Sequence, residues 1–123
     1  MKKNSNNSDL ICPIRYALNI IGGKWKLPVL CLLASGKPTR YGEIKRKVQG
    51  ITNMMLAQTL KELEHAGIVH RKQYNEIPPK VEYTLTVNGK SLLPTLEIIS
   101  SWGSSQLSKN GNKTDVCKIC KPG

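Results

Sequence analysis

The stretch "GITNMMLAQTLKELEHAGIV" (residues 50–69) decides the fold of this chain. Its apolar residues recur at intervals of three and four, which predicts a helix that buries Leu56, Leu60 and Leu63. Thr52 is suited to cap the start of this helix, and Gly67 is suited to end it in a left-handed conformation. A second set of side chains near the N-terminal end faces away from the leucines, so this helix has a face that the core does not use.

Three helices are expected before this stretch. "CPIRYALNIIG" (residues 12–22) has a proline in its first turn, and "KWKLPVLCLLASG" (residues 24–36) is more uniformly apolar, which predicts that the second helix is the buried one. "TRYGEIKRKVQG" (residues 39–50) predicts a short helix with Ile44 and Val48 inward. Only "QGI" separates this short helix from the next one, which is typical of a helix-turn-helix.

Two strands and a last helix are expected after it. "IVHRKQY" (residues 68–74) and "KVEYTLT" (residues 80–86) have strand character, and the rigid "NEIPP" between them predicts a β-hairpin. "TVNGKSLLPTLEIISSWG" (residues 86–103) returns to helical spacing, with Thr86 as its expected N-cap. Pro94 lacks a backbone N–H, so we expect either a kink there or a new helix that starts nearby.

This order of elements predicts an α+β fold, mostly α, namely a winged helix-turn-helix with a two-stranded β-hairpin as its wing. The length suits one small domain. We expect that domain to span residues 10–105. The polar segments 1–9 and 106–123 are expected to be flexible tails.

The charge of the chain indicates a polyanionic partner. The 123 residues include 19 Lys and Arg against 8 Asp and Glu, a formal net charge of +11. Residues 1–47 hold ten basic and two acidic side chains, whereas residues 48–80 hold four and three. A solubilising tail would give the same total, but together with a helix-turn-helix the excess favours duplex DNA.

The free face of the 50–69 helix suits the major groove of DNA, which is about 12 Å wide and admits one helix. Gln58 can offer a donor and an acceptor to adenine, and Met54 or Ala57 can pack on a thymine methyl group. Each of them could instead be an ordinary solvent-facing side chain. The residues expected to form the reading face are Thr52, Asn53, Met54, Ala57, Gln58 and Lys61.

Basic side chains at the rim of such a helix hold phosphates and fix the register without reading sequence. A solvated charged face is the alternative interpretation for each of them. The expected phosphate contacts, on the helix-turn-helix and on the wing, are Arg40, Lys45, Arg46, Lys47, Arg71, Lys72 and Lys80.

Residues 12–103 resemble the HxlR family of bacterial transcription regulators, which are relatives of the MarR group. The resemblance depends on a linked set of motifs, "GGKW", "GITNMML", "LKELEHAGIV", "IPPKVEYTLT" and a closing "WG". The fourth motif begins with isoleucine where the family pattern has valine. Such a collection is far more specific than one short motif.

The resemblance implies a homodimer in which the first helix and the C-terminal helix form the subunit interface, with one recognition helix for each half-site. The residues agree, because a domain of this size offers the apolar side chains of those helices little partner surface within one subunit. Packing on the first helix of the same chain is the alternative. The expected interface residues are Ile14, Leu18, Leu92, Leu96, Ile99 and Trp102.

Cys12 precedes Pro13 at the start of a helix, where unpaired backbone N–H groups favour a negative charge and lower the pKa of a thiol. In the family that the chain resembles, a cysteine matching this position senses electrophiles or oxidants in some members. Cys12 is therefore the candidate redox sensor. Cys31, within "VLCLL", is expected to be a small buried hydrophobe.

The "CKIC" of residues 117–120 has the spacing of a redox or metal motif. A zinc site needs four ligands, and two further ones are not evident nearby; a redox motif needs a strand before it and a helix after it. We therefore expect a tail. A thiol-redox or metal-binding role for Cys117 and Cys120 is the alternative.

The sequence thus predicts a sequence-specific duplex-DNA-binding transcription regulator that acts as a homodimer on a pseudo-palindromic operator and covers promoter DNA against polymerase. A nonspecific nucleic-acid-binding protein is a further alternative. We expect no enzyme, cofactor or metal, because no nucleophile with its base and no Gly-rich phosphate loop is present. We also expect a cytoplasmic protein with no membrane partner, because no apolar run is long enough for a bilayer span. Any inducer is unidentified.

Overall fold

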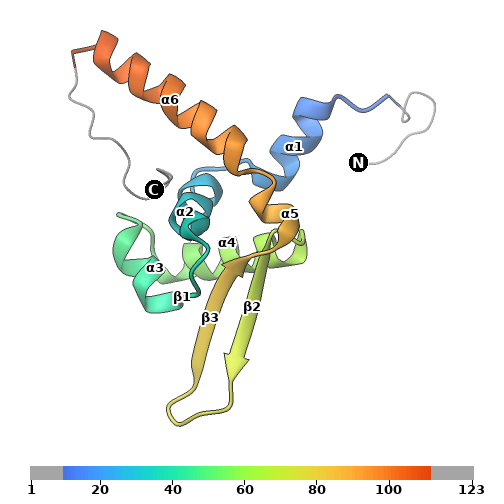
Figure 1. Cartoon of the computed structure of the whole chain (residues 1–123), viewed down its shortest axis with the longest axis vertical. Coiled ribbons are helices and arrows are strands. Elements are labelled where there is room, and N and C mark those ends of the chain that lie inside the picture. The colour runs from blue at the N-terminus through green and yellow to red at the C-terminus, as the bar shows by residue number, and fades with distance from the viewer. Residues whose placement is uncertain (1–9, 112–123) are drawn as a thin grey trace.

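The computed structural model describes residues 10–111 of the chain. It confirms the predicted winged helix-turn-helix, with the helices gathered at one end of a small sheet and the β2–β3 hairpin extending beyond them (Figure 1). The elements in chain order are α1 (Pro13–Ile21), α2 (Lys26–Leu32), the 3-10 helix η2 (Leu33–Ser35), β1 (Thr39–Arg40), α3 (Tyr41–Lys47), α4 (Asn53–His65), β2 (Val69–Tyr74), β3 (Lys80–Leu85), α5 (Val87–Lys90) and α6 (Leu93–Lys109).

Helix α4 begins and ends as its sequence predicts. The hydroxyl of Thr52 accepts a hydrogen bond from the backbone N–H of Met55 at 3.1 Å, which satisfies one donor of the first turn. Gly67 has a φ of +77°, the left-handed conformation that a side chain would strain. Leu56, Leu60 and Leu63 are all buried.

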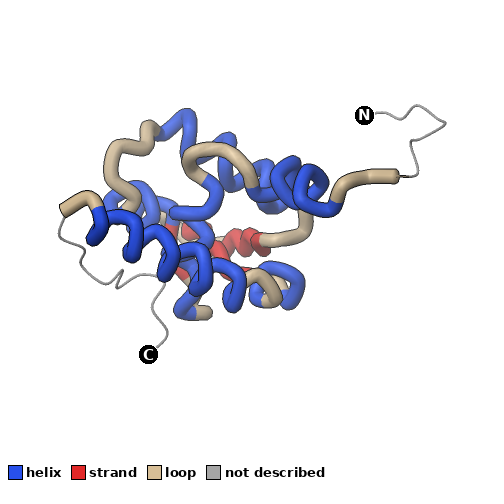
Figure 2. Tube along the Cα trace, turned by 90° about the horizontal axis from the view of Figure 1, so that it is seen from above, coloured by secondary structure: helices blue, strands red, loops and turns tan. Residues whose placement is uncertain are grey.

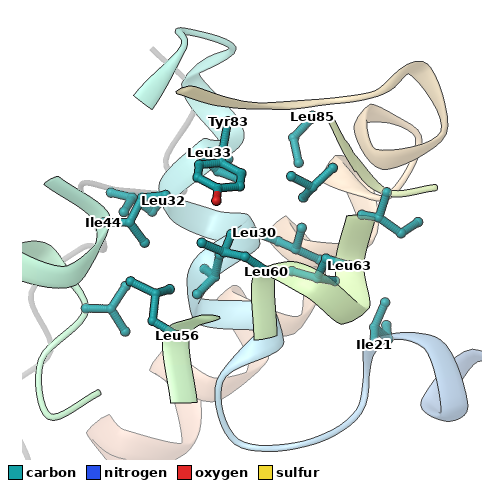
Figure 3. Close-up of a cluster of buried hydrophobic side chains, with 14 of the residues drawn as sticks. Ile21, Leu30, Leu32, Leu33, Ile44, Leu56, Leu60, Leu63, Tyr83 and Leu85 are labelled. Carbon is teal, nitrogen blue, oxygen red and sulfur yellow. The ribbon is translucent and has the colours of Figure 1, made fainter. Parts of the chain in front are cut away.

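The core lies between α2, α4 and the inner face of the sheet. Figure 3 shows Leu30 of α2 beside Leu60 of α4, and Leu33 beside Tyr83 of β3. The more apolar α2 is buried through Val29, Leu30 and Leu32, as expected from its composition. The buried Thr59 also lies on the inner face of α4, which the spacing of the leucines alone did not indicate.

The sheet contains the predicted hairpin and one strand more. Strands β2 and β3 pair antiparallel from Val69 opposite Leu85 to Tyr74 opposite Lys80. The two-residue strand β1 pairs with the other edge of β3, which gives the order β1-β3-β2. The predicted two-stranded hairpin wing is thus confirmed, and β1 was not expected because a strand of two residues is too short to show alternation in its sequence.

The segment from residue 87 to residue 109 forms two helices, α5 and α6, which confirms the expectation that a new helix starts near Pro94. The short α5 is capped by Thr86, whose hydroxyl accepts from the N–H of Gly89 at 3.0 Å. Gly89 packs so closely on the carbonyl of Ile68 that a Cβ atom there would overlap the oxygen. A new helix, α6, then starts with Pro94 in its first turn and continues to Lys109, past the expected boundary at residue 105.

Helices α1 and α6 project from the end of the molecule opposite the hairpin tip (Figures 1 and 2). Within each of them the described structure buries one residue, Ile21 in α1 and Leu96 in α6. Within residues 10–111 no single helix is long and apolar enough to cross a bilayer; α1 and residues 26–35 meet that test only as a pair bent by 71°. These two helices therefore gain little of their stability from contacts with their own chain.

Candidate nucleic-acid interface

The reading face expected on α4 is exposed in the structure. Because the leucines occupy the inner side, Asn53, Met54, Ala57, Gln58 and Lys61 all lie on solvent-accessible surface, and Met54 is 82% exposed. Thr52 is exposed as well, although its hydroxyl is engaged as the N-cap. Contact of these residues with bases remains a prediction.

A hydrogen bond between the two helices of the motif holds the start of α4 in place. The phenol of Tyr41, the first residue of α3, donates to the backbone carbonyl of Asn53 at 2.9 Å. Burial raises the pKa of Tyr41, so the phenol stays protonated and remains a donor. Sequence reasoning missed this brace, because no periodic pattern marks the role of Tyr41.

The side chain of Gln58 is already hydrogen-bonded within α4. Its Nε2 atom donates to Oε2 of Glu62, one turn further along, at 2.6 Å. Since a carboxylate only accepts, this contact establishes which end of the amide faces Glu62. The amide oxygen and the second N–H of Gln58 have no protein partner within residues 10–111.

The basic residues around α3 divide into engaged and exposed side chains. Lys47 pairs with Glu43 of its own helix at 3.1 Å, and Lys45 is half-buried. Arg40, in β1, and Arg46 are exposed. Of the expected phosphate contacts on this part of the surface, Arg40 and Arg46 are thus the two that are both exposed and outside the ion pairs of residues 10–111.

The two faces of the wing differ in chemistry. Lys72, Tyr74, Lys80 and Glu82 share one face by register, where the Tyr74 phenol donates to Glu82 at 2.9 Å. Lys80 lies 3.7 Å from that carboxylate and 4.5 Å from the Tyr74 ring centroid, and the Lys72 ammonium lies 5.0 Å from the same ring. The hydrogen bond to Glu82 raises the pKa of Tyr74.

Lys80 is therefore engaged within the wing, and its contact with a phosphate stays a prediction. Arg71 lies on the other face, directly opposite the buried Tyr83 and two residues from the buried Val69. Its guanidinium is exposed and donates to Gln73 at 3.1 Å. The side of the wing that continues the core surface thus presents Arg71.

Most of the apolar residues expected at a dimer interface are exposed. Ile14 and Leu18 of α1 are 68% and 58% exposed, and Ile99 and Trp102 of α6 are 45% and 67% exposed. Leu96 is different, because it is 3% exposed and belongs to the core of its own chain, and Leu92 is half-buried against that core. The argument that these two leucines lack partner surface was wrong; Ile98, 70% exposed, lies on the free side of α6 instead.

Cys12 is the N-cap of α1 and is exposed. The thiol makes no cap hydrogen bond, but the backbone N–H groups of Arg15 and Ile14, with a smaller effect from the charge of Arg15, lower the pKa of Cys12. Cys31 is half-buried beside the core. Cys117 and Cys120 lie outside the described residues, and within residues 10–111 no group of His, Cys, Asp and Glu side chains could hold a metal ion.

The profile of the HxlR-like helix-turn-helix family matches residues 20–111, and the chain belongs to this family of transcriptional regulators. An uncharacterised HTH-type transcriptional regulator of Methanothermobacter thermautotrophicus is 47% identical over 97 residues, which cover 79% of this chain and 73% of that protein.

Two solved structures of similar proteins are described by their redox state. The redox regulator HypR in its oxidised form is 44% identical with a TM-score of 0.72, covering 76% of this chain and 96% of HypR. Diamide-treated YodB from B. subtilis is 34% identical with a TM-score of 0.62, covering 79% and 94%.

The lowered pKa of Cys12 predicts that its thiol is alkylated faster near neutral pH in the folded protein than in the unfolded chain. A larger fraction is thiolate, which is the reactive form, and the midpoint of the pH profile shifts downward. Iodoacetamide labelling over a pH series, with and without urea, followed by peptide mass spectrometry, measures this and separates Cys12 from Cys31. Equal midpoints in the two states would show that the start of α1 does not activate the thiol.

Proposed function

We propose that this transcriptional regulator acts as a homodimer on a pseudo-palindromic duplex-DNA operator and responds to modification of Cys12. The observation that carries the proposal is the exposed N-terminal half of α4, which is held in place by its buried leucine face and by the hydrogen bond from Tyr41 to Asn53. A helix fixed in this way presents the same side chains to every DNA site, which sequence-specific reading requires.

The surroundings of α4 suit DNA on both flanks. Arg40 in β1, Arg46 in α3 and Arg71 in β2 are exposed, so cationic groups lie on the elements that precede and follow α4. The formal net charge of +11 adds long-range attraction to phosphate. The same arginines would serve a nonspecific nucleic-acid-binding protein, but such a protein would not depend on the identity of residue 58.

The exposed apolar side chains of α1 and α6 support a dimer. Ile14, Leu18, Ile98 and Trp102 are each more than half exposed, on two helices that project from the core. Large apolar side chains exposed together on projecting helices are a common mark of a protein interface. A second copy provides the same surface, and the two-fold symmetry gives half-sites about 10 base pairs apart.

A thiol response is proposed because Cys12 starts the same helix that offers this apolar surface. The similar proteins HypR and YodB are described in oxidised and diamide-treated forms. Added bulk or an inter-subunit disulfide at Cys12 would displace α1 in the interface and change the separation of the two recognition helices. Loss of one half-site would release the operator, since each base pair of recognition contributes roughly 1–3 kcal/mol.

Gln58→Ala and Arg71→Ala should impair binding in different ways. Gln58→Ala should change base preference at one position of each half-site by roughly 1–3 kcal/mol, whereas Arg71→Ala should weaken all sequences alike and lower the salt slope by about 1. Selection from a random duplex library, then titration of operator and scrambled DNA at several salt concentrations, measures both. Equal losses on both DNAs for both variants would contradict the division into reading and positioning residues.

Ile98→Glu should disrupt the dimer without disturbing the fold. Ile98 is 70% exposed in one subunit, so only a partner subunit would bury the carboxylate. We expect the dimer dissociation constant to rise more than about tenfold. Sedimentation equilibrium measures it, and Val87→Glu, at an 86% exposed position on α5, is the matched control. A dimer unaffected by Ile98→Glu would place the interface elsewhere.

Oxidation should release the operator through Cys12. Diamide joins two thiols into a disulfide and is itself reduced to the hydrazine, so it requires no other reactant. In a background with Cys117→Ser and Cys120→Ser, diamide should weaken operator binding at least about tenfold and a reductant should restore it. The same background with Cys12→Ser should not respond. An equal response would assign the effect to Cys31 or to the DNA assay itself.

A further inference from the structure

A chain of polar contacts connects the end of α1 with the middle of the recognition helix. The ammonium of Lys26, the first residue of α2, donates to the backbone carbonyl of Ile20 at 3.1 Å. The same ammonium lies 3.2 Å from Oε1 of Glu62. The other carboxylate oxygen of Glu62 accepts from Nε2 of Gln58 at 2.6 Å. Each oxygen of Glu62 thus has its own donor.

These contacts run along an open hollow, so packing does not hold the exposed side chain of Gln58 in place. A cavity of about 680 Å³ lies between α1, α2 and α4, and Lys26, Gln58 and Glu62 are among its lining residues together with Asn19, Lys61 and His65. Since this space is not filled by neighbouring side chains, the rotamer of Gln58 depends on its hydrogen bond. Glu62 supplies that bond from one turn away on the same helix.

We infer that Glu62, held by Lys26, is the residue that positions Gln58 for base recognition. This inference rests on the proposed function, in which Gln58 reads a base. Reading adenine requires one N–H donor and one acceptor in a defined order. While one N–H of the Gln58 amide donates to Glu62, its other N–H and its oxygen remain available to the base in one fixed orientation. The flipped amide is disfavoured because its oxygen would face the carboxylate oxygen of Glu62.

The ammonium of Lys26 offsets the negative charge of Glu62 on a surface that is proposed to face DNA phosphates. Its side chain is 14% exposed, against 45% for Glu62, so the ion pair is partly shielded from water. Hydrogen bonds from Gln58 and Lys26, together with the charge of Lys26, lower the pKa of Glu62. Glu62 is therefore ionised at neutral pH and acts only as an acceptor, while the neighbouring ammonium offsets its repulsion of DNA.

The test compares base discrimination by full-length variants at the operator position where Gln58→Ala changes the preference. Glu62→Ala should reduce discrimination at that position by roughly twofold to 150-fold, the range for residues that share one hydrogen-bond network, and leave the other positions unchanged. Glu62→Gln should restore part of it, because its amide oxygen can still accept from Gln58. In a Gln58→Ala background, Glu62→Ala should have no further effect there.

Glu64→Ala is the matched control on the same helix. Glu64 is exposed and has no side-chain hydrogen bond or ion pair within residues 10–111, so its loss should leave discrimination unchanged. Circular dichroism and sizing check that each variant is folded. The inference is wrong, while the proposed function stands, if Gln58→Ala changes base preference at one position and Glu62→Ala does not. It is also wrong if Glu62→Ala reduces discrimination by the same factor in the wild type and in the Gln58→Ala background. If the wild type shows no base preference, both fail together.

Discussion

The packing of the leucine face of α4 on α2 is the constraint on which the rest of the structure depends. Leu56, Leu60 and Leu63 are fully or almost fully buried against the helices and sheet of the core, and each such side chain contributes about 1.5–3 kcal/mol. Rotating α4 by a third of a turn would expose them. The same energy that forms the core therefore fixes which side chains face outward, so the candidate reading face follows from the hydrophobic effect.

Within residues 10–111, three ion pairs engage lysines that composition alone would count as free charge. Lys26 pairs with Glu62, Lys47 with Glu43 and Lys80 with Glu82. The first and third also join hydrogen-bonded groups, the amide of Gln58 and the phenol of Tyr74. Two acidic residues thus accept hydrogen bonds from polar side chains at the candidate interface, and the exposed arginines are the proposed phosphate contacts.

The outer helices show that one subunit does not bury all of its apolar surface. Helix α6 anchors itself on the core through Leu96, and this contact turns Ile98 and Trp102 away from the chain. Helix α1 has Cys12 as its N-cap, and near its end the backbone carbonyl of Ile20 accepts a hydrogen bond from Lys26. The proposed interface, the thiol and the polar contacts to Gln58 therefore meet on one helix that its own core constrains weakly.

The sequence by itself determined the helix-turn-helix, the hairpin and the outward set on α4, because these follow from local spacing, from the Thr52 cap and from the left-handed Gly67. Only the tertiary structure decided the pairing of β1 with β3, the burial of Leu96, the brace from Tyr41 to Asn53 and the engagement of Lys26 with Glu62. Those contacts join residues from different elements. Periodicity shows which way a side chain faces, but a specific partner exists only once the elements have packed.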